Sequence, residues 1–138
     1  LLVRDIEADL LPFCAAEKMG VVVYSPMQKG LLTGTMTKER AAQFPPDDHR
    51  RRDPQFREPL LSANLQLVEC LRAIAERHGK TVMHLALAWV LRRPEVTSAI
   101  VGARRPAQVE EAIGGADWHL TELDLADIDQ CLKKREQI

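Results

Sequence analysis

Two short loops in this sequence carry residue types that bind phosphate groups. The first, SPMQKGLLTG at residues 25–34, follows the apolar run VVVY and contains Gly30 and Gly34. Because a glycine has no Cβ, its backbone can approach an anion closely. The second loop, GARRPAQ at residues 102–108, begins with Gly102. One interpretation is that both loops contact an anion; the other is that their glycines only form turns.

The arginines of the second loop suit a phosphate monoester. Arg104 and Arg105 precede Pro106, and proline is typical of the first turn of a helix, where its missing N–H has no helical partner. A helix N-terminus offers free N–H groups and the positive end of the helix dipole. An arginine adds a planar fork of donors that matches phosphate oxygens. The alternative interpretation is that Arg104 is a surface charge.

Other kinds of site find no support in the spacing of the residues. Neither loop matches a Walker loop or the GxGxxG pattern, and no Ser/His/Asp set is evident. The histidines have no metal-ligand spacing, so we expect no metal site and assign surface or capping roles to His49, His78, His84 and His119. No cysteine pair is close enough for a CxxC motif, and we expect buried thiols in a reducing cytosol at Cys14, Cys70 and Cys131.

Charge and hydropathy limit the class of protein. Nineteen basic and twenty acidic residues among 138 leave a net charge of −1, which does not indicate a nucleic acid or a membrane surface as partner. No apolar run approaches the roughly 20 residues of a membrane-spanning helix. We therefore expect a cytoplasmic location, with no nucleic-acid partner and no membrane partner.

The elements that would position the two loops alternate between strand and helix. Apolar runs predict strands at 21–25 and 97–101, each covered on both faces, as in parallel sheets. Periodic apolar residues and capping patterns predict helices at 4–19, 62–78 and 81–93, from Pro106 to Ile113, and at 121–135. This order is typical of a parallel α/β sheet. Since two strands leave both sheet edges unpaired, we expect one partial domain, 1–138, from the C-terminal part of a longer protein.

Local signals predict where these helices begin and end. We expect Ser62 to cap the helix that it begins, and Thr121 to form a capping box with Asp124. Glycines are expected to end helices at Gly20, Gly79 and Gly114–Gly115. The polar, proline-rich segment 35–60 is expected to be a long solvated loop. There, Asp47, Asp48 and Asp53 largely cancel the charge of Arg50, Arg51 and Arg52.

The two glycine-containing loops belong to a wider pattern. A family resemblance is carried by YSPMQKGLLTG at 24–34 and AIVGARRPAQVEEA at 99–112. Both are similar to the C-terminal part of the aldo-keto reductase family. The segment 47–58 resembles the family's substrate-side loop, and 4–14 resembles the helix before the tyrosine strand. The resemblance implies an α/β fold, the C-terminal part of a (β/α)8 TIM barrel that is incomplete in this chain.

The resemblance also implies a function. Family members reduce aldehydes or ketones with NADPH, so NADP(H) is the expected cofactor and a small-molecule carbonyl compound the expected substrate. Tyr24 would stack on the nicotinamide, and the pyrophosphate path would be lined by Ser25, Pro26, Met27, Gly30 and Leu31. Gly102 and Arg104 would take the adenosine 2′-phosphate, and Gln108 and Glu111 would hold the adenine. The catalytic Asp, Tyr, Lys and His of the family have no counterpart here, so the expected catalytic residues are none.

Three functions remain open at this point. The chain can be the cofactor-binding part of a reductase, a catalytically inactive remnant or binding module, or a regulatory subunit that senses the cofactor. The missing catalytic residues motivate the second interpretation. Such a piece would expose strand edges and apolar helix faces.

Overall fold

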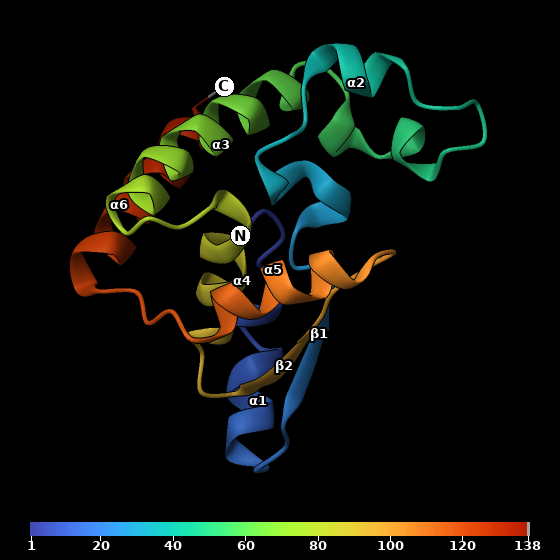
Figure 1. The fold of residues 1–138 in the computed structure, drawn as a ribbon. Coiled ribbons are helices and arrows are strands. Elements are labelled where there is room, and N and C mark those ends of the chain that lie inside the picture. The colour runs from blue at the N-terminus through green and yellow to red at the C-terminus, as the bar shows by residue number, and fades with distance from the viewer. Residues whose placement is uncertain (138) are drawn as a thin grey trace. The chain divides into compact units, whose positions relative to one another are not determined.

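The structure is a computed structural model that describes residues 1–137 (Figure 1). Its helices are α1 (Leu10–Ala16), α2 (Lys38–Ala42), α3 (Leu60–Arg77), α4 (Val82–Leu91), α5 (Pro106–Ala116) and α6 (Glu122–Glu136), and its strands are β1 (Val21–Tyr24) and β2 (Val96–Ile100). The chain divides into two units. Unit 1 comprises Leu1–Gln28 and Met83–Leu120, and unit 2 comprises Lys29–Val82 and the chain from Thr121 onward.

The two strands of unit 1 form a parallel pair. Val23 lies opposite Ala99 and Tyr24 opposite Ile100, and the register shifts once, between Val21 and Val22. The sequence predicted both strands to within one residue at each end, and the parallel pairing is confirmed. Because the strands run in the same direction, the segments that follow Tyr24 and Ile100 leave from the same edge of the sheet.

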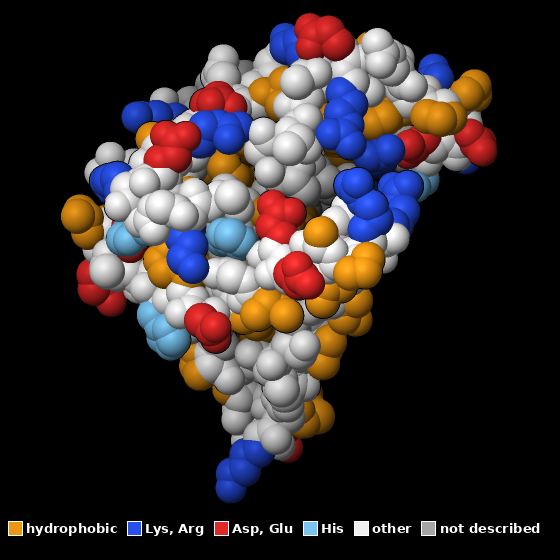
Figure 2. Space-filling view, in the orientation of Figure 1, with side chains coloured by type: hydrophobic (Ala, Val, Ile, Leu, Met, Phe, Trp, Pro, Cys, Tyr) orange, Lys and Arg blue, Asp and Glu red, His pale blue; other side chains and the backbone are white. Residues whose placement is uncertain are grey.

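The prediction that both strands are covered on both faces is wrong for this chain. Side chains along β1 alternate between half-buried and exposed, with Val22 57% and Tyr24 81% exposed. On β2 the side chain of Ile100 is 59% exposed. Figure 2 shows hydrophobic side chains along the edge where Figure 1 draws β1. An apolar strand sequence shows that both faces of the strand could be buried. Within the described residues, no element covers the face that carries Val22 and Tyr24.

The N-terminal helix is shorter than the predicted span 4–19. A 3-10 helix, Asp5–Glu7, precedes α1, so Pro12 falls in the first turn of α1, where its missing N–H has no helical partner. The helix ends before Gly20. Lys18 takes the left-handed conformation with φ +55°, and the N–H of Met19 donates to the Cys14 carbonyl at 2.8 Å. This is a Schellman ending with lysine at the position where glycine was expected.

A small apolar cluster packs α4 against α5 within unit 1. Met83 and Leu87 of α4 and Ala112 of α5 are buried, and the partly buried residues packed against them are Met27, Ala99 and Val101. The prediction that Gly114–Gly115 ends the helix is wrong, since α5 continues to Ala116. The two glycines instead allow close approach to α4. A Cβ on Gly115 would lie 2.9 Å from the backbone oxygen of His84.

The substitution Gly115→Ala is therefore expected to destabilise the protein by about 1–3 kcal/mol, the usual cost of overpacking. The new Cβ would also lie 3.0 Å from both the Cα of His84 and the Cβ of Leu87, and backbone cannot move aside. Gly102→Ala is the matched control, because a Cβ there would meet no atom within 4 Å. Urea unfolding of the two variants measures the difference. Equal stability of both would contradict the close approach.

Helices α3 and α6 pack against each other in unit 2. The predicted capping box is confirmed: the Thr121 side chain accepts from the Asp124 N–H, and the Asp124 carboxylate accepts from the Thr121 N–H. Gly79, with φ +62°, follows α3, and the next N–H, of Lys80, donates back to the Ala75 carbonyl. Ser62 does not cap α3, which begins two residues earlier. Its hydroxyl donates instead to Glu58 at 2.6 Å.

Segment 35–60 is more ordered than the solvated loop that its composition predicts. It contains α2 and two 3-10 helices, His49–Arg52 and Pro54–Phe56, capped by side chains. Phe44 and Phe56 are buried, and their rings meet edge to face at 5.7 Å. The expected neutralisation of charge is seen at Arg50, whose guanidinium lies 2.6 Å from Asp48. Two phenylalanines therefore form a small local core, which the polar composition of the segment did not predict.

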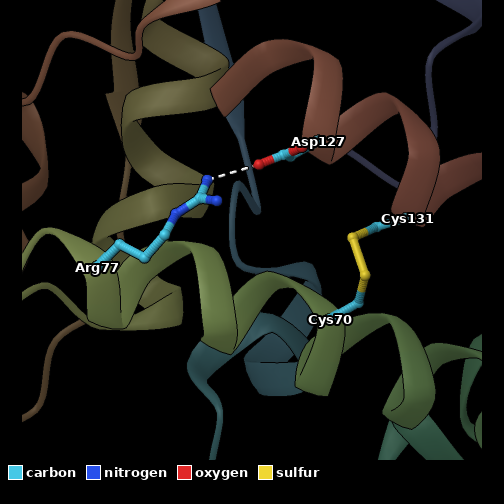
Figure 3. The surroundings of a disulfide bond; sticks show 4 residues. All are labelled: Cys70, Arg77, Asp127 and Cys131. Carbon is cyan, nitrogen blue, oxygen red and sulfur yellow. Dashed lines mark hydrogen bonds and ion pairs between the residues drawn. A yellow bond between two sulfur atoms is a disulfide. The ribbon is translucent and has the colours of Figure 1, made fainter. Parts of the chain in front are cut away.

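The expectation of three buried thiols is wrong for two of them. Cys70 of α3 and Cys131 of α6 form a disulfide across a sequence separation of 61 residues (Figure 3). Cys14 is the free, buried cysteine among the described residues. Spacing along the chain gives no sign of this pairing, because only helix packing brings the two residues together.

No helix within residues 1–137 has the length and apolar character needed to cross a membrane.

Candidate functional site

The strongest candidate site lies where β1 and β2 end in unit 1. Tyr24 is the last residue of β1, and its ring is 81% exposed, so a planar group could stack on it. Ser25 follows with φ +52°, a left-handed conformation that is uncommon for a residue other than glycine. Gly102 follows β2 by two residues and is exposed. The parallel pairing thus places both loop starts at the same sheet edge.

Pro26 and Met27 turn the first loop back toward the body of unit 1. Pro26 is buried, and Met27 packs on the Met83, Leu87 and Ala112 cluster, as does Val101 of the second loop. One apolar cluster therefore anchors the start of both loops. The side chain of Met27 packs on this cluster. Only its backbone and the exposed part of its side chain could therefore line the predicted pyrophosphate path.

The second loop presents an open approach to the N-terminus of α5. A Cβ on Gly102 would meet no atom within 4 Å, so the backbone can be approached closely there. Arg104 is exposed, and its guanidinium has no bonding partner among residues 1–137. Its backbone N–H donates to the Gln108 Oε1 at 2.8 Å. Pro106 is the first residue of α5, as predicted, and no side chain caps this end.

His84 of α4 is bonded to the backbone of Glu111, one of the two residues predicted to hold the adenine. Its Nε2 lies 2.7 Å from the backbone oxygen of Glu111, and since a carbonyl only accepts, Nε2 carries the proton. The Glu111 side chain itself is exposed. Gln108 and Glu111, three residues apart, lie on neighbouring positions of the α5 surface.

The remaining two predicted residues, Gly30 and Leu31, belong to unit 2. Gly30 has φ +96°, and a Cβ there would meet no atom within 4 Å. Leu31 is fully buried at 0% exposure, so only its backbone could face a ligand. Lys29 also adopts a left-handed φ of +54°, and its ammonium is bonded to Asp53 at 2.8 Å. The ammonium is thus already paired within the protein.

Comparison with known proteins shows the family of this chain. The model of the Aldo/keto reductase family matches residues 1–133. The chain belongs to the aldo/keto reductase family. Members of this family are oxidoreductases that use nicotinamide cofactors.

Several family relatives match almost the whole chain. Aldo-keto reductase YhdN of Bacillus subtilis is 37% identical over 134 residues, which is 96% of this chain and 40% of that protein. The NADH-specific methylglyoxal reductase of Escherichia coli is 32% identical over 124 residues, 90% of this chain and 37% of that protein. The chain thus spans about 40% of the length of the curated relatives it matches.

A solved structure confirms the fold. The glycerol dehydrogenase AKR11B4 from Gluconobacter oxydans superposes with a TM-score of 0.87 at 36% identity, over 96% of this chain and 40% of that one. The predicted fold class, part of a (β/α)8 barrel, is confirmed. The site residues taken from the family resemblance stay predictions, because the comparisons do not test them.

Several residues of the candidate site gave no signal in the sequence. Nothing in the local sequence marks the left-handed Ser25 and Lys29 or the ion pair between Lys29 and Asp53. Outside this site, the sequence predicted the role of Asp124 in the capping box. It gave no sign of the bond from Asp124 to His78 at 2.8 Å, because these residues are 46 positions apart. Among residues 1–137 no group of three His, Cys, Asp or Glu side chains could hold a metal ion.

Proposed function

We propose that this chain supplies the cofactor-binding loops of an NADPH-dependent reductase of aldehydes or ketones. The observation that carries the proposal is the parallel pairing of β1 and β2, which sends the loops after Tyr24 and Ile100 from one sheet edge. In parallel α/β folds, ligands bind beyond the carboxyl ends of the strands. The bound cofactor would supply the hydride that reduces the carbonyl group.

The residues present fit a phosphorylated dinucleotide. The open backbone at Gly102 and the uncapped N-terminus of α5 can receive an anion. Arg104, exposed and with no partner for its guanidinium among residues 1–137, can add a charge-assisted bond to the 2′-phosphate of NADPH. Tyr24 offers its exposed ring to the nicotinamide, and Gln108 and Glu111 would lie at the adenine. In the second unit, Gly30 offers open backbone to the pyrophosphate, beside Leu31.

Arg104→Ala is the experiment that tests the proposal. In the native polypeptide that contains these 138 residues, we expect the dissociation constant of NADPH to rise about tenfold to a hundredfold, as for loss of one hydrogen bond to a charged group. The affinity for NADH, which lacks the 2′-phosphate, is expected to stay unchanged. Quenching of protein fluorescence on titration measures both constants.

The control for this experiment is Lys133→Ala, which removes an exposed charge from α6. Unchanged NADPH affinity in Arg104→Ala would show that the predicted 2′-phosphate contact is wrong. Equal loss of NADPH and NADH affinity would instead place Arg104 on a part common to both cofactors. A preference of the unaltered protein for NADH, the property named for the Escherichia coli relative, would overturn the assignment of NADPH.

The exposed apolar side chains favour a second candidate, a binding module without catalysis. Besides the strand residues, unit 1 exposes Leu10 at 48% and Phe13 at 56%, and exposed apolar surface is typical of association sites. The purified 138-residue chain distinguishes the two functions. Reductase turnover by this chain alone would exclude the binding-module function, whereas tight NADPH binding by the native polypeptide without turnover would favour a cofactor sensor.

A further inference from the structure

An unbroken series of hydrogen bonds links Lys29 to the C-terminal helix within unit 2. Lys29 Nζ donates to Asp53 Oδ2 at 2.8 Å, and Asp53 Oδ1 accepts from the Gln55 N–H at 2.9 Å. Asn64 Nδ2 donates to the backbone oxygen and to Oε1 of Gln55, both at 2.9 Å. Arg135 of α6 closes the series, with Nε 2.6 Å from Asn64 Oδ1 and Nη2 3.0 Å from Gln55 Oε1. We call these five residues the Lys29–Arg135 network.

One end of the network holds a backbone conformation that is unfavourable by itself. Lys29 has φ +54° and Gly30 φ +96°. A left-handed residue other than glycine costs roughly 1–2 kcal/mol, so the surroundings have to impose it. Two further contacts act here: Leu31 is fully buried, and the Thr33 hydroxyl donates to the Gly30 carbonyl at 2.8 Å. The bond from Lys29 to Asp53 fixes the side chain of the left-handed lysine.

The middle of the network is buried and fully satisfied. Asn64 is 0% exposed, its amide donates twice and its carbonyl oxygen accepts from Arg135. Asp53 belongs to the same network, between Lys29 and Gln55. Burial raises its pKa, yet the Lys29 ammonium and the Gln55 N–H outweigh this and lower the pKa below its ordinary value. Asp53 is therefore ionised at neutral pH and keeps its bond to Lys29.

The other end of the network places a charge in a costly position. Burial lowers the pKa of the Arg135 guanidinium, and the partners described for it are two neutral amide groups rather than a carboxylate. Within residues 1–137 no salt bridge joins Arg135 to a carboxylate, although the charge of Glu136 partly offsets the effect of burial on the pKa. A partly buried arginine held mainly by neutral amides costs free energy that a hydrophobic residue would not. Its two bonds do, however, fix the orientation of Gln55 and Asn64. We therefore expect the bonds of Arg135 to fix the positions of Gln55 and Asn64 more than they stabilise the folded protein.

We propose that Arg135 is a positioning residue for the cofactor-binding loop at Lys29–Leu31, acting through Asn64, Gln55 and Asp53. This inference rests on the proposed function, in which the backbone at Gly30 and Leu31 faces the pyrophosphate of the cofactor. In this proposal, Arg135 of α6 fixes the position of the turn Pro54–Phe56 through Gln55 and Asn64. The turn in turn fixes Asp53, which holds Lys29 and hence the loop. The role of Lys29 is to tie the loop down, while its ammonium stays on Asp53 rather than on phosphate.

The variant Arg135→Ala tests this in the native polypeptide. We expect the dissociation constant of NADPH to rise about twofold to tenfold, in the range of couplings through a contact network. Without any cofactor, amide hydrogen exchange is expected to speed up at residues 29–31 and 53–56. Lys134→Ala, an exposed neighbour on the same helix, is the control and is expected to change neither measurement. Faster exchange throughout α3 and α6 instead would indicate general destabilisation and overturn the proposal.

A double-variant cycle adds a test that a merely structural role would not pass. If Arg135 acts through Asp53, the double variant Arg135→Ala/Asp53→Ala binds NADPH no more weakly than Asp53→Ala alone. Additive losses would overturn the proposal. Exchange needs no cofactor, so the two hypotheses fail separately: faster exchange at 29–31 in a protein that does not bind NADPH contradicts the proposed function and supports the positioning.

Discussion

Reduction of the disulfide between Cys70 and Cys131 is expected to lower the free energy of unfolding by about 4 kcal/mol. The bond joins α3 to α6 across 61 residues, and a crosslink that closes so long a loop restricts the unfolded chain strongly. Figure 3 shows Cys70 and Cys131 bridging these two helices, with the ion pair from Arg77 to Asp127 further along them. Urea unfolding with and without a thiol reductant measures the loss.

The double variant Cys70→Ser/Cys131→Ser is the control for this experiment. It should unfold at the same lower urea concentration in both conditions, because the reductant has no bond left to break. Cys14 stays a free thiol throughout and does not contribute. An unchanged midpoint in the original protein, with mass spectrometry showing the bond intact before and reduced after treatment, would contradict the expected stabilisation.

Replacement of Asp124 by alanine is expected to cost about 2–5 kcal/mol, because it removes a helix cap, worth about 0.5–2 kcal/mol, and a hydrogen bond to a buried carboxylate, worth about 1.5–3 kcal/mol. The Asp124 side chain is 2% exposed, and Oδ1 lies 2.8 Å from His78 Nε2. Oδ2 accepts from the Thr121 hydroxyl at 2.8 Å and from the Thr121 N–H at 3.0 Å. The variant would therefore lose the helix cap and the bond to His78 together. Thermal unfolding measures the effect.

Asp127→Asn is the matched control for Asp124. It removes the negative charge from the ion pair of Arg77 with Asp127, in which Arg77 is 47% and Asp127 28% exposed. Such pairs contribute less than about 1 kcal/mol, so this variant should unfold close to the temperature of the original protein. If both variants lost the same stability, the special position of Asp124 would be contradicted.

Asp124 also predicts how stability depends on pH. Burial acts to raise its pKa, but bonds from Thr121 and His78 outweigh burial and lower the pKa from 3.8 to about 2. A carboxyl group with a lowered pKa in the folded state stabilises the fold above its unfolded pKa, and this contribution is lost as the pH falls from about 4 toward 2. Asp124→Asn should flatten this part of a plot of unfolding free energy against pH.

Much of the local structure could be predicted because short-range chemistry decides it. The capping box at Thr121 and the left-handed Gly79 after α3 each depend on residues within about one helical turn. Both strands, likewise, were marked by short apolar runs. The predictions failed where a neighbour far along the chain decides the outcome. Gly114–Gly115 continue α5 where α4 packs against them, and Gly20, expected to end α1, instead lies where a Cβ would meet the side chain of Thr97.

The candidate site divides in the same way. The glycines and arginines of its two loops could be read from the sequence, since the ability to approach and bind an anion is a property of the residue type. The ion pair of Lys29 with Asp53 could not be predicted, because it depends on how segment 35–60 folds around Phe44 and Phe56. That local core decides where Asp53 lies.

The sequence by itself determined the family, the order of strands and helices, and the two glycine-containing loops that follow the strands. Only the tertiary structure decided which residues hold those loops in place. The Cys70–Cys131 bond and the Arg135 contact to Asn64 join positions 61 and 71 residues apart. Such pairs form when α3 and α6 pack side by side, and the packing depends on the whole buried surface rather than on any short motif.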